Sequence, residues 1–192
     1  DALSKSKLTS LNVSDNKIGD EGATAIANAL LDSPLTSLNV SRNKIGDDGA
    51  SAIANALPDS PLTSLALGAN EIGDKGASAI ANALPHSPLI NLDLSYNYRG
   101  MTDKGATAIA DALPDSPLTS LNVSGNVLGD ESVIAIARAL PRSSLTSLDL
   151  HHNNKIGDKS ATAIANVLPN SPLTSLNLSD NKIDDEGASA IA

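Results

Sequence analysis

Residues 8–30 read LTSLNVSDNKIGDEGATAIANAL, and close copies of this stretch recur along the 192-residue chain. The seven copies begin near residues 8, 35, 62, 89, 118, 145 and 173, so the period is 27 to 29 residues. A fixed period of this length is typical of stacked-repeat proteins, in which each unit buries its apolar face only against its neighbours. We therefore expect residues 1–192 to form one elongated domain, with both ends falling inside a repeat.

The first half of each repeat predicts a short strand. In the first copy, Leu11 and Val13 alternate with Ser10, Asn12 and Ser14. Alternation of this kind gives a strand one apolar and one polar face. The strand is expected to span about three to five residues before a polar turn begins.

The second half of each repeat predicts a helix. Gly22, Ile26 and Leu30 recur at intervals of four residues and would line the helix face turned toward the strand. Asp20 stands directly before this apolar period, so we expect its carboxylate to cap the N-terminus of its own helix. Prolines such as Pro58 follow the helical segments and would end them.

Stacking these strand–turn–helix units determines the expected curvature. Paired strands lie about 4.8 Å apart, whereas packed helices need roughly 8 to 10 Å. The strands must therefore line the inner side of an arc. The expected fold is an α/β solenoid, a curved horseshoe with a parallel β-sheet on the concave side and α-helices on the convex side.

One asparagine recurs in every repeat, in the turn directly after the strand. A buried asparagine amide can satisfy backbone groups left free where a strand ends. We therefore predict a structural ladder committed to internal hydrogen bonds rather than to a ligand. Its predicted members are Asn16, Asn43, Asn70, Asn97, Asn126, Asn153 and Asn181, with Asn154 as the alternative in the sixth repeat.

The fourth and sixth repeats depart most from the others. The fourth has two extra residues before its helix and contains both tyrosines of the chain and its only methionine, while the sixth has one extra residue and two adjacent histidines. Tyrosine and arginine often dominate binding energy at protein interfaces. We hypothesise a protein-binding patch, with harmless drift of surface loops as the alternative. The patch comprises Asp93, Tyr96, Tyr98, Arg99, Met101, Asp149, His151 and His152.

The residues indicate no catalytic, metal or cofactor site. Asp149, His151, His152 and Asp180 are of the types that bind zinc, but adjacent strand residues point to opposite faces, so we expect no metal site. The serines belong to the repeated unit, and a nucleophile with its own base is not apparent. We expect a non-enzymatic protein without a cofactor.

Charge and hydropathy restrict the partners. The formal net charge is −9, spread along the repeats, and such a surface repels phosphate backbones. The longest strongly apolar run, 133–137, is far shorter than the roughly 18 residues of a membrane helix. We therefore expect a monomer that binds a protein, with no nucleic-acid partner and no membrane insertion.

Four glycosylation acceptor motifs bear on the compartment. They begin at Asn12, Asn39, Asn122 and Asn177, all at the same strand position. Glycans at all four would crowd a single face of the sheet. This favours a compartment without N-glycosylation, so we expect a cytoplasmic protein or one from a bacterial setting.

The consensus L-x-x-L-x-L-x-x-N-x-I/L followed by D-x-G-x-x-A-I-A-x-A-L covers residues 8–192. It resembles the ribonuclease-inhibitor-like class of leucine-rich repeats, which is similar to repeats of NOD-like receptors, the GTPase-activating protein for Ran and bacterial effectors. The chain lacks the cysteines of ribonuclease inhibitor and the phosphate-binding loop of NOD-like receptors.

The resemblance implies a scaffold for protein–protein interaction, delivered to a host cytosol if the protein is a bacterial effector. Two alternatives stay open. One is a regulator of a partner enzyme, such as a GTPase activator that supplies Arg42 or Arg99. The other is a structural section of a longer array.

Overall fold

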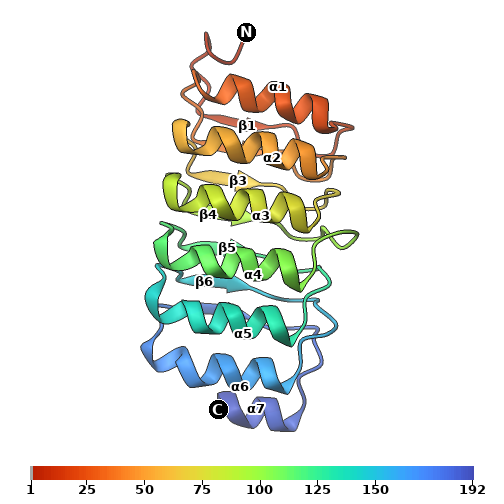
Figure 1. The fold of residues 1–192 in the computed structure, drawn as a ribbon, viewed down its shortest axis with the longest axis vertical. Coiled ribbons are helices and arrows are strands. Elements are labelled where there is room, and N and C mark those ends of the chain that lie inside the picture. Colours follow the sequence, from red (N-terminus) through yellow and green to blue (C-terminus); the bar gives the residue numbers. More distant parts are fainter. Residues whose placement is uncertain (1) are drawn as a thin grey trace.

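A computed structural model describes residues 2–192. In that part of the chain, seven three-residue strands alternate with seven helices (Figure 1). The strands are β1 (Ser10–Asn12), β2 (Ser37–Asn39), β3 (Ser64–Ala66), β4 (Asn91–Asp93), β5 (Ser120–Asn122), β6 (Ser147–Asp149) and β7 (Ser175–Asn177). The helices are α1 (Asp20–Leu30), α2 (Asp47–Ala56), α3 (Asp74–Ala83), α4 (Asp103–Ala112), α5 (Asp130–Ala139), α6 (Asp158–Val167) and α7 (Asp185–Ile191).

Short 3-10 turns, each with one proline, follow five of the helices. They are η1 (Leu57–Asp59), η2 (Leu84–His86), η3 (Leu113–Asp115), η4 (Leu140–Arg142) and η5 (Leu168–Asn170). Even the longest helix, α1, has only 11 residues. Within residues 2–192, none of the helices has the length and hydrophobicity needed to span a bilayer.

All strands belong to one parallel sheet, ordered from β1 to β7 as in the sequence. Neighbouring strands pair equivalent residues, as Leu11 does with Leu38. The extra residues of repeats four and six lie after the strands, so the register is kept. Asp93 of β4, for example, still pairs with Asn122 of β5. The extra residues therefore enlarge only the turns between strand and helix.

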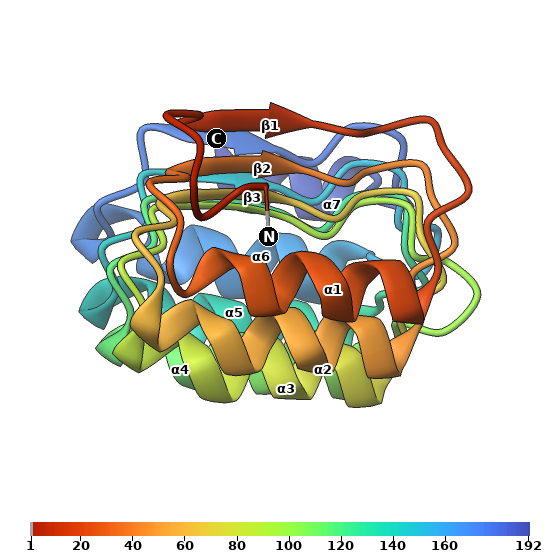
Figure 2. The same cartoon turned by 90° about the horizontal axis from the view of Figure 1, so that it is seen from above.

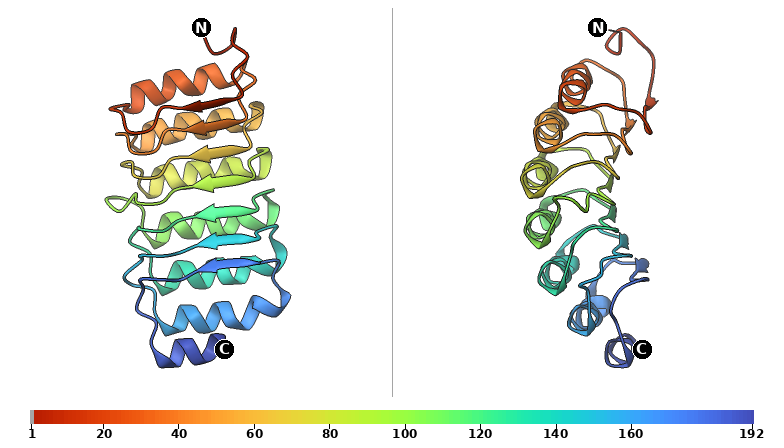
Figure 3. Two further views of the ribbon diagram at one scale, coloured as in Figure 1. Left: turned by 180° about the vertical axis from the view of Figure 1, so that it is seen from behind. Right: turned by 90° about the vertical axis from the view of Figure 1, so that its right-hand side faces the viewer.

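The helices form one layer and the sheet forms the other (Figure 2). In side view the array is curved, with the strands on the concave side and the helices on the convex side (Figure 3). This curvature follows from the wider spacing that packed helices require. The fold class expected from the repeat is confirmed.

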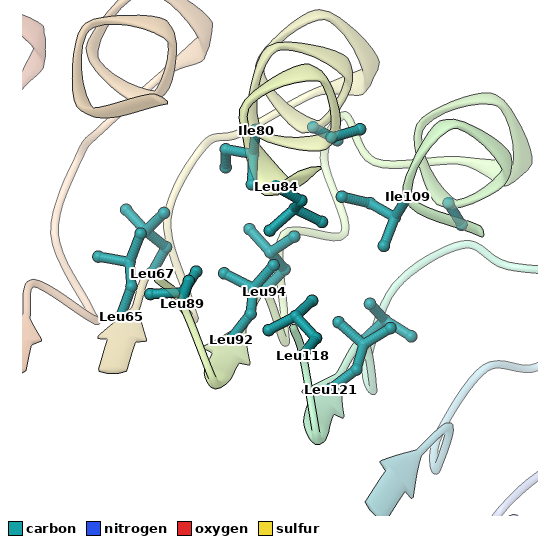
Figure 4. Close-up of a cluster of buried hydrophobic side chains, with 14 of the residues drawn as sticks. Leu65, Leu67, Ile80, Leu84, Leu89, Leu92, Leu94, Ile109, Leu118 and Leu121 are labelled. Atoms are coloured by element: carbon teal, nitrogen blue, oxygen red, sulfur yellow. The ribbon is translucent and has the colours of Figure 1, made fainter. Parts of the chain in front are cut away.

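The core is a continuous apolar column between the two layers (Figure 4). In the third repeat, Leu65 and Leu67 reach it from the strand side, while Ile80 and Leu84 reach it from the helix side, all at most 1% exposed. Burying each such side chain contributes about 1.5 to 3 kcal/mol. Small residues such as Ala77, also fully buried, allow adjacent helices to approach closely.

The ladder asparagines connect each repeat to the preceding one. Asn97 is completely buried, and its Nδ2 donates to two carbonyl oxygens of its own repeat and, at 3.2 Å, to that of Leu67. Its Oδ1 accepts the backbone N–H groups of Asn70 at 3.2 Å and Ile72 at 3.1 Å. A single side chain thus satisfies backbone groups of two repeats.

The enlarged turn of repeat four interrupts this ladder. Within residues 2–192, the buried Oδ1 of Asn126 accepts no hydrogen bond, unlike the equivalent atoms of Asn97 and Asn153. The N–H groups of Gly100 and Met101 instead donate to the carbonyl oxygen of Asn97. An unsatisfied buried acceptor costs about 1 to 3 kcal/mol, so this turn is held at some expense of stability.

The aspartate that begins each helix bonds to the following repeat rather than capping its own helix. Asp47 Oδ1 accepts the N–H groups of Gly73 at 2.8 Å and Gly76 at 2.7 Å. Equivalent contacts are made by Asp20, Asp74, Asp103, Asp130 and Asp158.

The expectation that these aspartates cap their own helices is therefore wrong. Each aspartate is the first helical residue, and α1, α2, α3, α5 and α6 have no side-chain cap of their own. The free N–H groups at the start of the adjacent helix form a site of partial positive charge, which attracts the carboxylate sideways.

Candidate protein-binding surface

Each strand is followed by one residue with a left-handed backbone conformation, directly before the ladder asparagine. The φ angles of these residues lie between 53° and 63°. The residues are Asp15, Arg42, Ala69, Tyr96, Gly125, His152 and Asp180. Residues other than glycine rarely adopt this backbone conformation, and here the ladder hydrogen bonds stabilise it. The most variable position of the repeat thus forms a row along the strand-to-helix edge of the sheet.

The ring of Tyr96 extends from repeat four across repeat five. A Cβ atom at Gly125 would lie 2.5 Å from the ring, so glycine leaves the space that the ring occupies. The Tyr96 ring centroid lies 6.0 Å from that of His151, edge to face, and 6.1 Å from that of His152, stacked. Side chains of repeats four and six therefore meet above repeat five.

A chain of hydrogen bonds holds Tyr96 in this position. Asp149 Oδ1 lies 2.8 Å from His151 Nδ1, and His151 Nε2 lies 3.1 Å from the Tyr96 hydroxyl. An ionised carboxylate only accepts, so Nδ1 carries a proton; when the imidazole is neutral, Nε2 is the acceptor for the tyrosine hydroxyl. His152 Nδ1 is paired with Asp180 Oδ2. The structure thus brings together Tyr96, Asp149, His151 and His152.

Tyr98 and Arg99 lie in the enlarged turn of repeat four, which projects beyond the turns beside it as a green loop (Figures 1 and 3). Tyr98 is 57% exposed and Tyr96 39%. The Arg99 guanidinium carbon lies 6.0 Å from the Tyr98 ring centroid, at the limit of a cation–π contact. We call Tyr96, Tyr98, Arg99, His151 and His152 the tyrosine–histidine patch. Asp149 holds the His151 ring of this patch through its hydrogen bond to Nδ1.

The structure contradicts the assignment of Met101 to a partner-contacting surface. Its side chain is completely buried and belongs to the hydrophobic core. After the two extra residues, Met101 occupies the place that Ile72 has in repeat three, and its N–H donates to Asn97 O at 3.0 Å. The turn thus returns to the core at the methionine, so a partner cannot reach this side chain.

Strand alternation does not argue against a metal site at the two histidines. Both His151 and His152 come after β6 and contact the same tyrosine, so alternation along a strand does not describe them. Each of them is paired with a carboxylate. Within residues 2–192, no group of three or more His, Cys, Asp or Glu residues is placed to hold a metal ion.

Three open grooves border both tyrosines, and two of them are of similar size. One, of about 430 Å³, lies over repeat three and borders Arg42, Gly68, Asp93 and both tyrosines; we call it the repeat-three groove. The other, of about 410 Å³, lies toward repeat five and borders the tyrosines and His152. A larger hollow, of about 710 Å³, is lined by residues around α5, α6 and α7 and includes none of the patch.

Sequence reasoning missed two kinds of residue at this surface. Repeat four also has Ile90 and exposed Asn91 where the first repeat has Thr9 and Ser10, next to the half-buried Asp93. Repeat three has small residues in place of larger ones, and these create the repeat-three groove. The aligned repeats do show these positions. A search restricted to large and charged residues overlooks positions where the side chain is small or absent.

Gly125→Ala is expected to displace the Tyr96 ring, because the added methyl group would overlap it. The backbone should tolerate alanine, since Ala69 has nearly the same φ in repeat three. With tyrosine-selective isotope labelling, the Tyr96 signal should move while that of Tyr98 changes little. Tyr96→Phe, which removes only the hydroxyl, should alter the His151 ring signals and keep the stacking. An unmoved Tyr96 signal in Gly125→Ala would show that the ring does not lie over residue 125.

The fold and the surface together define a class of protein. It is a curved solenoid of stacked repeats with an open concave sheet and an exposed aromatic patch at one edge. The family model described as Leucine Rich repeat matches residues 4–27, 32–54, 59–81, 115–137, 143–165 and 170–192. The chain belongs to the leucine-rich repeat family. The matched segments leave out 82–114, which contain the enlarged turn of repeat four.

Two solved structures have a similar fold. One is the actin-binding site 2 of leiomodin-1, with 24% identity and a TM-score of 0.58, over 72% of this chain and 82% of that one. The other is the internalin InlF from Listeria monocytogenes, with 23% identity and a TM-score of 0.55, over 95% of this chain and 51% of that one. A search of the curated proteins finds no match.

Proposed function

We propose that this chain is a protein-binding module whose partner lies against the concave sheet and contacts the tyrosine–histidine patch. One observation carries the proposal. Tyr96 is exposed, yet it is held in place by His151, His152 and the space above Gly125. A side chain that is already ordered loses less conformational entropy when a partner binds.

The composition of the surface supports a protein partner. Most of the concave face consists of serine, threonine and asparagine, which seldom dominate binding energy. Tyr96, Tyr98 and Arg99 are of the types that do. Leucine-rich repeats generally act in protein–protein interaction, and a protein of similar fold is an actin-binding site. A binding role, rather than catalysis, accounts for these features.

Tyr98→Ala is expected to weaken the partner complex by about 2 kcal/mol, or roughly 30-fold in Kd, as hot-spot tyrosines do. Candidate partners would be captured on the immobilised chain, identified by mass spectrometry and purified. Their affinities would then be measured by isothermal titration calorimetry against wild type and variants.

Leu31→Ala provides the matched control. The exposed fraction of Leu31, 47%, is similar to that of Tyr98. Leu31 lies at the C-terminal end of α1, on the helix layer. A specific partner should bind Leu31→Ala as it binds wild type. If every captured protein binds Tyr98→Ala and His152→Ala with wild-type affinity, the patch is not the binding surface and the proposal fails.

A further inference from the structure

The repeat-three groove exists because three positions of the third repeat carry small residues. Ala66, Gly68 and Ala69 stand where repeat four has Asp93, Ser95 and Tyr96. Five of the other repeats have serine at the position of Gly68. The resulting hollow, of about 430 Å³, is bordered by side chains of repeats two and four. Its floor is backbone and methyl groups, so recognition depends on the walls.

One wall contains a carboxylate that is only partly used. Asp93 is half-buried, and its Oδ1 accepts the N–H of Ser95 at 2.8 Å. Among residues 2–192, Oδ2 has no hydrogen-bond or ion-pair partner. Across the sheet Asp93 pairs with Ala66, which offers only a methyl group. Asp149, at the same position of repeat six, is paired with His151.

Both tyrosines also belong to this wall, although the Tyr96 ring extends toward repeat six. Tyr96 and Tyr98 border the groove beside Asp93. Aromatic faces attract cations, and a carboxylate with an unused oxygen accepts charge-assisted hydrogen bonds. The combination of two tyrosines and one such carboxylate favours a positively charged group.

The opposite rim contains a cation, Arg42, whose effect must be considered. Its Nε lies 4.0 Å from Asp15 Oδ1, and Asp15 belongs to repeat one, on the side away from Asp93. Both side chains are 70% exposed, so solvent screens the charge of Arg42. Asp93 is half-buried and therefore less exposed to solvent than Arg42.

We propose that the repeat-three groove binds the side chain of an arginine or lysine carried by an extended segment of the protein partner. This inference rests on the proposed function, because it names the chemistry that the partner presents. The cation would lie beside the two tyrosines and bond to Asp93 Oδ2. The net charge of −9 also favours a basic partner segment.

The two tyrosines allow a direct test with the whole chain. Incorporated 3-fluorotyrosine gives one fluorine signal for each of Tyr96 and Tyr98. Titration with N-acetyl-arginine amide should shift both signals saturably, and N-acetyl-lysine amide should do the same. N-acetyl-citrulline amide has the same shape without the charge and should cause no saturable shift. Equal responses to arginine and citrulline would overturn the proposal.

Three variants locate the site. Asp93→Asn should weaken arginine binding by about tenfold or more, since a charge-assisted hydrogen bond is lost. Gly68→Ser restores the residue of the other repeats. Its Cβ would lie 2.7 Å from Ser95 Oγ and 3.2 Å from Asp93 Oδ2, so the new side chain should crowd both groups and block the groove. Arg42→Ala should leave arginine binding unchanged or strengthen it, and weaker binding by this variant would contradict a cation site at Asp93.

Asp59→Asn is the charge-matched control, because this exposed carboxylate lies in η1, away from the strands. It should bind the arginine amide as wild type does, and loss of binding here would contradict a local site. The two proposals can fail separately. If a partner complex is weakened by Tyr98→Ala but not by Asp93→Asn or Gly68→Ser, the groove inference is wrong while the binding module remains.

Discussion

Asn97→Ala is expected to lower the free energy of unfolding by about 4 kcal/mol, because a completely buried side chain would lose five hydrogen bonds to two repeats. The buried N–H groups of Asn70 and Ile72 would be left without an acceptor, whereas the three carbonyl oxygens keep other donors. Urea unfolding followed by circular dichroism should show the midpoint falling by about 1.5 M.

Two other asparagine variants serve as comparisons for the stability loss expected of Asn97→Ala. Asn126→Ala should cost less, since Asn126 Oδ1 has no partner among the described residues and only the three Nδ2 bonds are lost. Asn154→Ala, at an exposed residue beside Asn153, should change stability by less than about 0.5 kcal/mol. Equal losses for Asn97 and Asn154 would contradict the ladder.

Asp130→Ala is expected to lower the free energy of unfolding by about 2 kcal/mol at neutral pH, because its carboxylate accepts bonds from Gly157 N, Ser160 N and Ser160 Oγ. Burial raises the pKa of Asp130. The hydrogen bonds from Ser160 and Gly157, helped by the charge of Lys159, outweigh burial and lower the pKa below its ordinary value of 3.8.

The lowered pKa of Asp130 determines how the free energy of unfolding depends on pH. A carboxyl whose pKa is lower in the folded than in the unfolded state stabilises the fold fully above the unfolded value. This contribution should disappear as the pH falls from 3.8 through the folded pKa of Asp130. The difference in unfolding free energy between wild type and Asp130→Asn should therefore shrink below pH 3.8. Glu131→Gln, at the exposed next residue, should show a much smaller difference at any pH.

The architecture could be predicted from the sequence because each repeat has a single way to bury its leucines. The alternation around Leu11 allows only one strand face to be apolar, and the repeated period aligns equivalent residues of neighbouring strands. A register shift of one residue would expose every strand leucine. The fold therefore depends on a pattern that is repeated seven times.

The arrangement of the patch could be predicted only in part. Aligning the repeats indicates that Tyr96 and His152 occupy the same position, but not that the tyrosine ring extends over Gly125 to a histidine 55 residues later. That direction depends on a missing side chain in repeat five. The error at Met101 has a similar origin, because composition does not show which residue of an enlarged turn returns to the core.

Each helix-initiating aspartate bonds to the repeat that follows it, so the array has a direction along the chain. Asp20 serves the helix after its own, and so on to Asp158, which serves α7. Among residues 2–192, α1 receives no such carboxylate. Each helix from α2 to α7 has backbone N–H groups at its start bonded by an aspartate of the repeat before it. The solenoid behaves as a directional stack, in which each layer secures the layer after it.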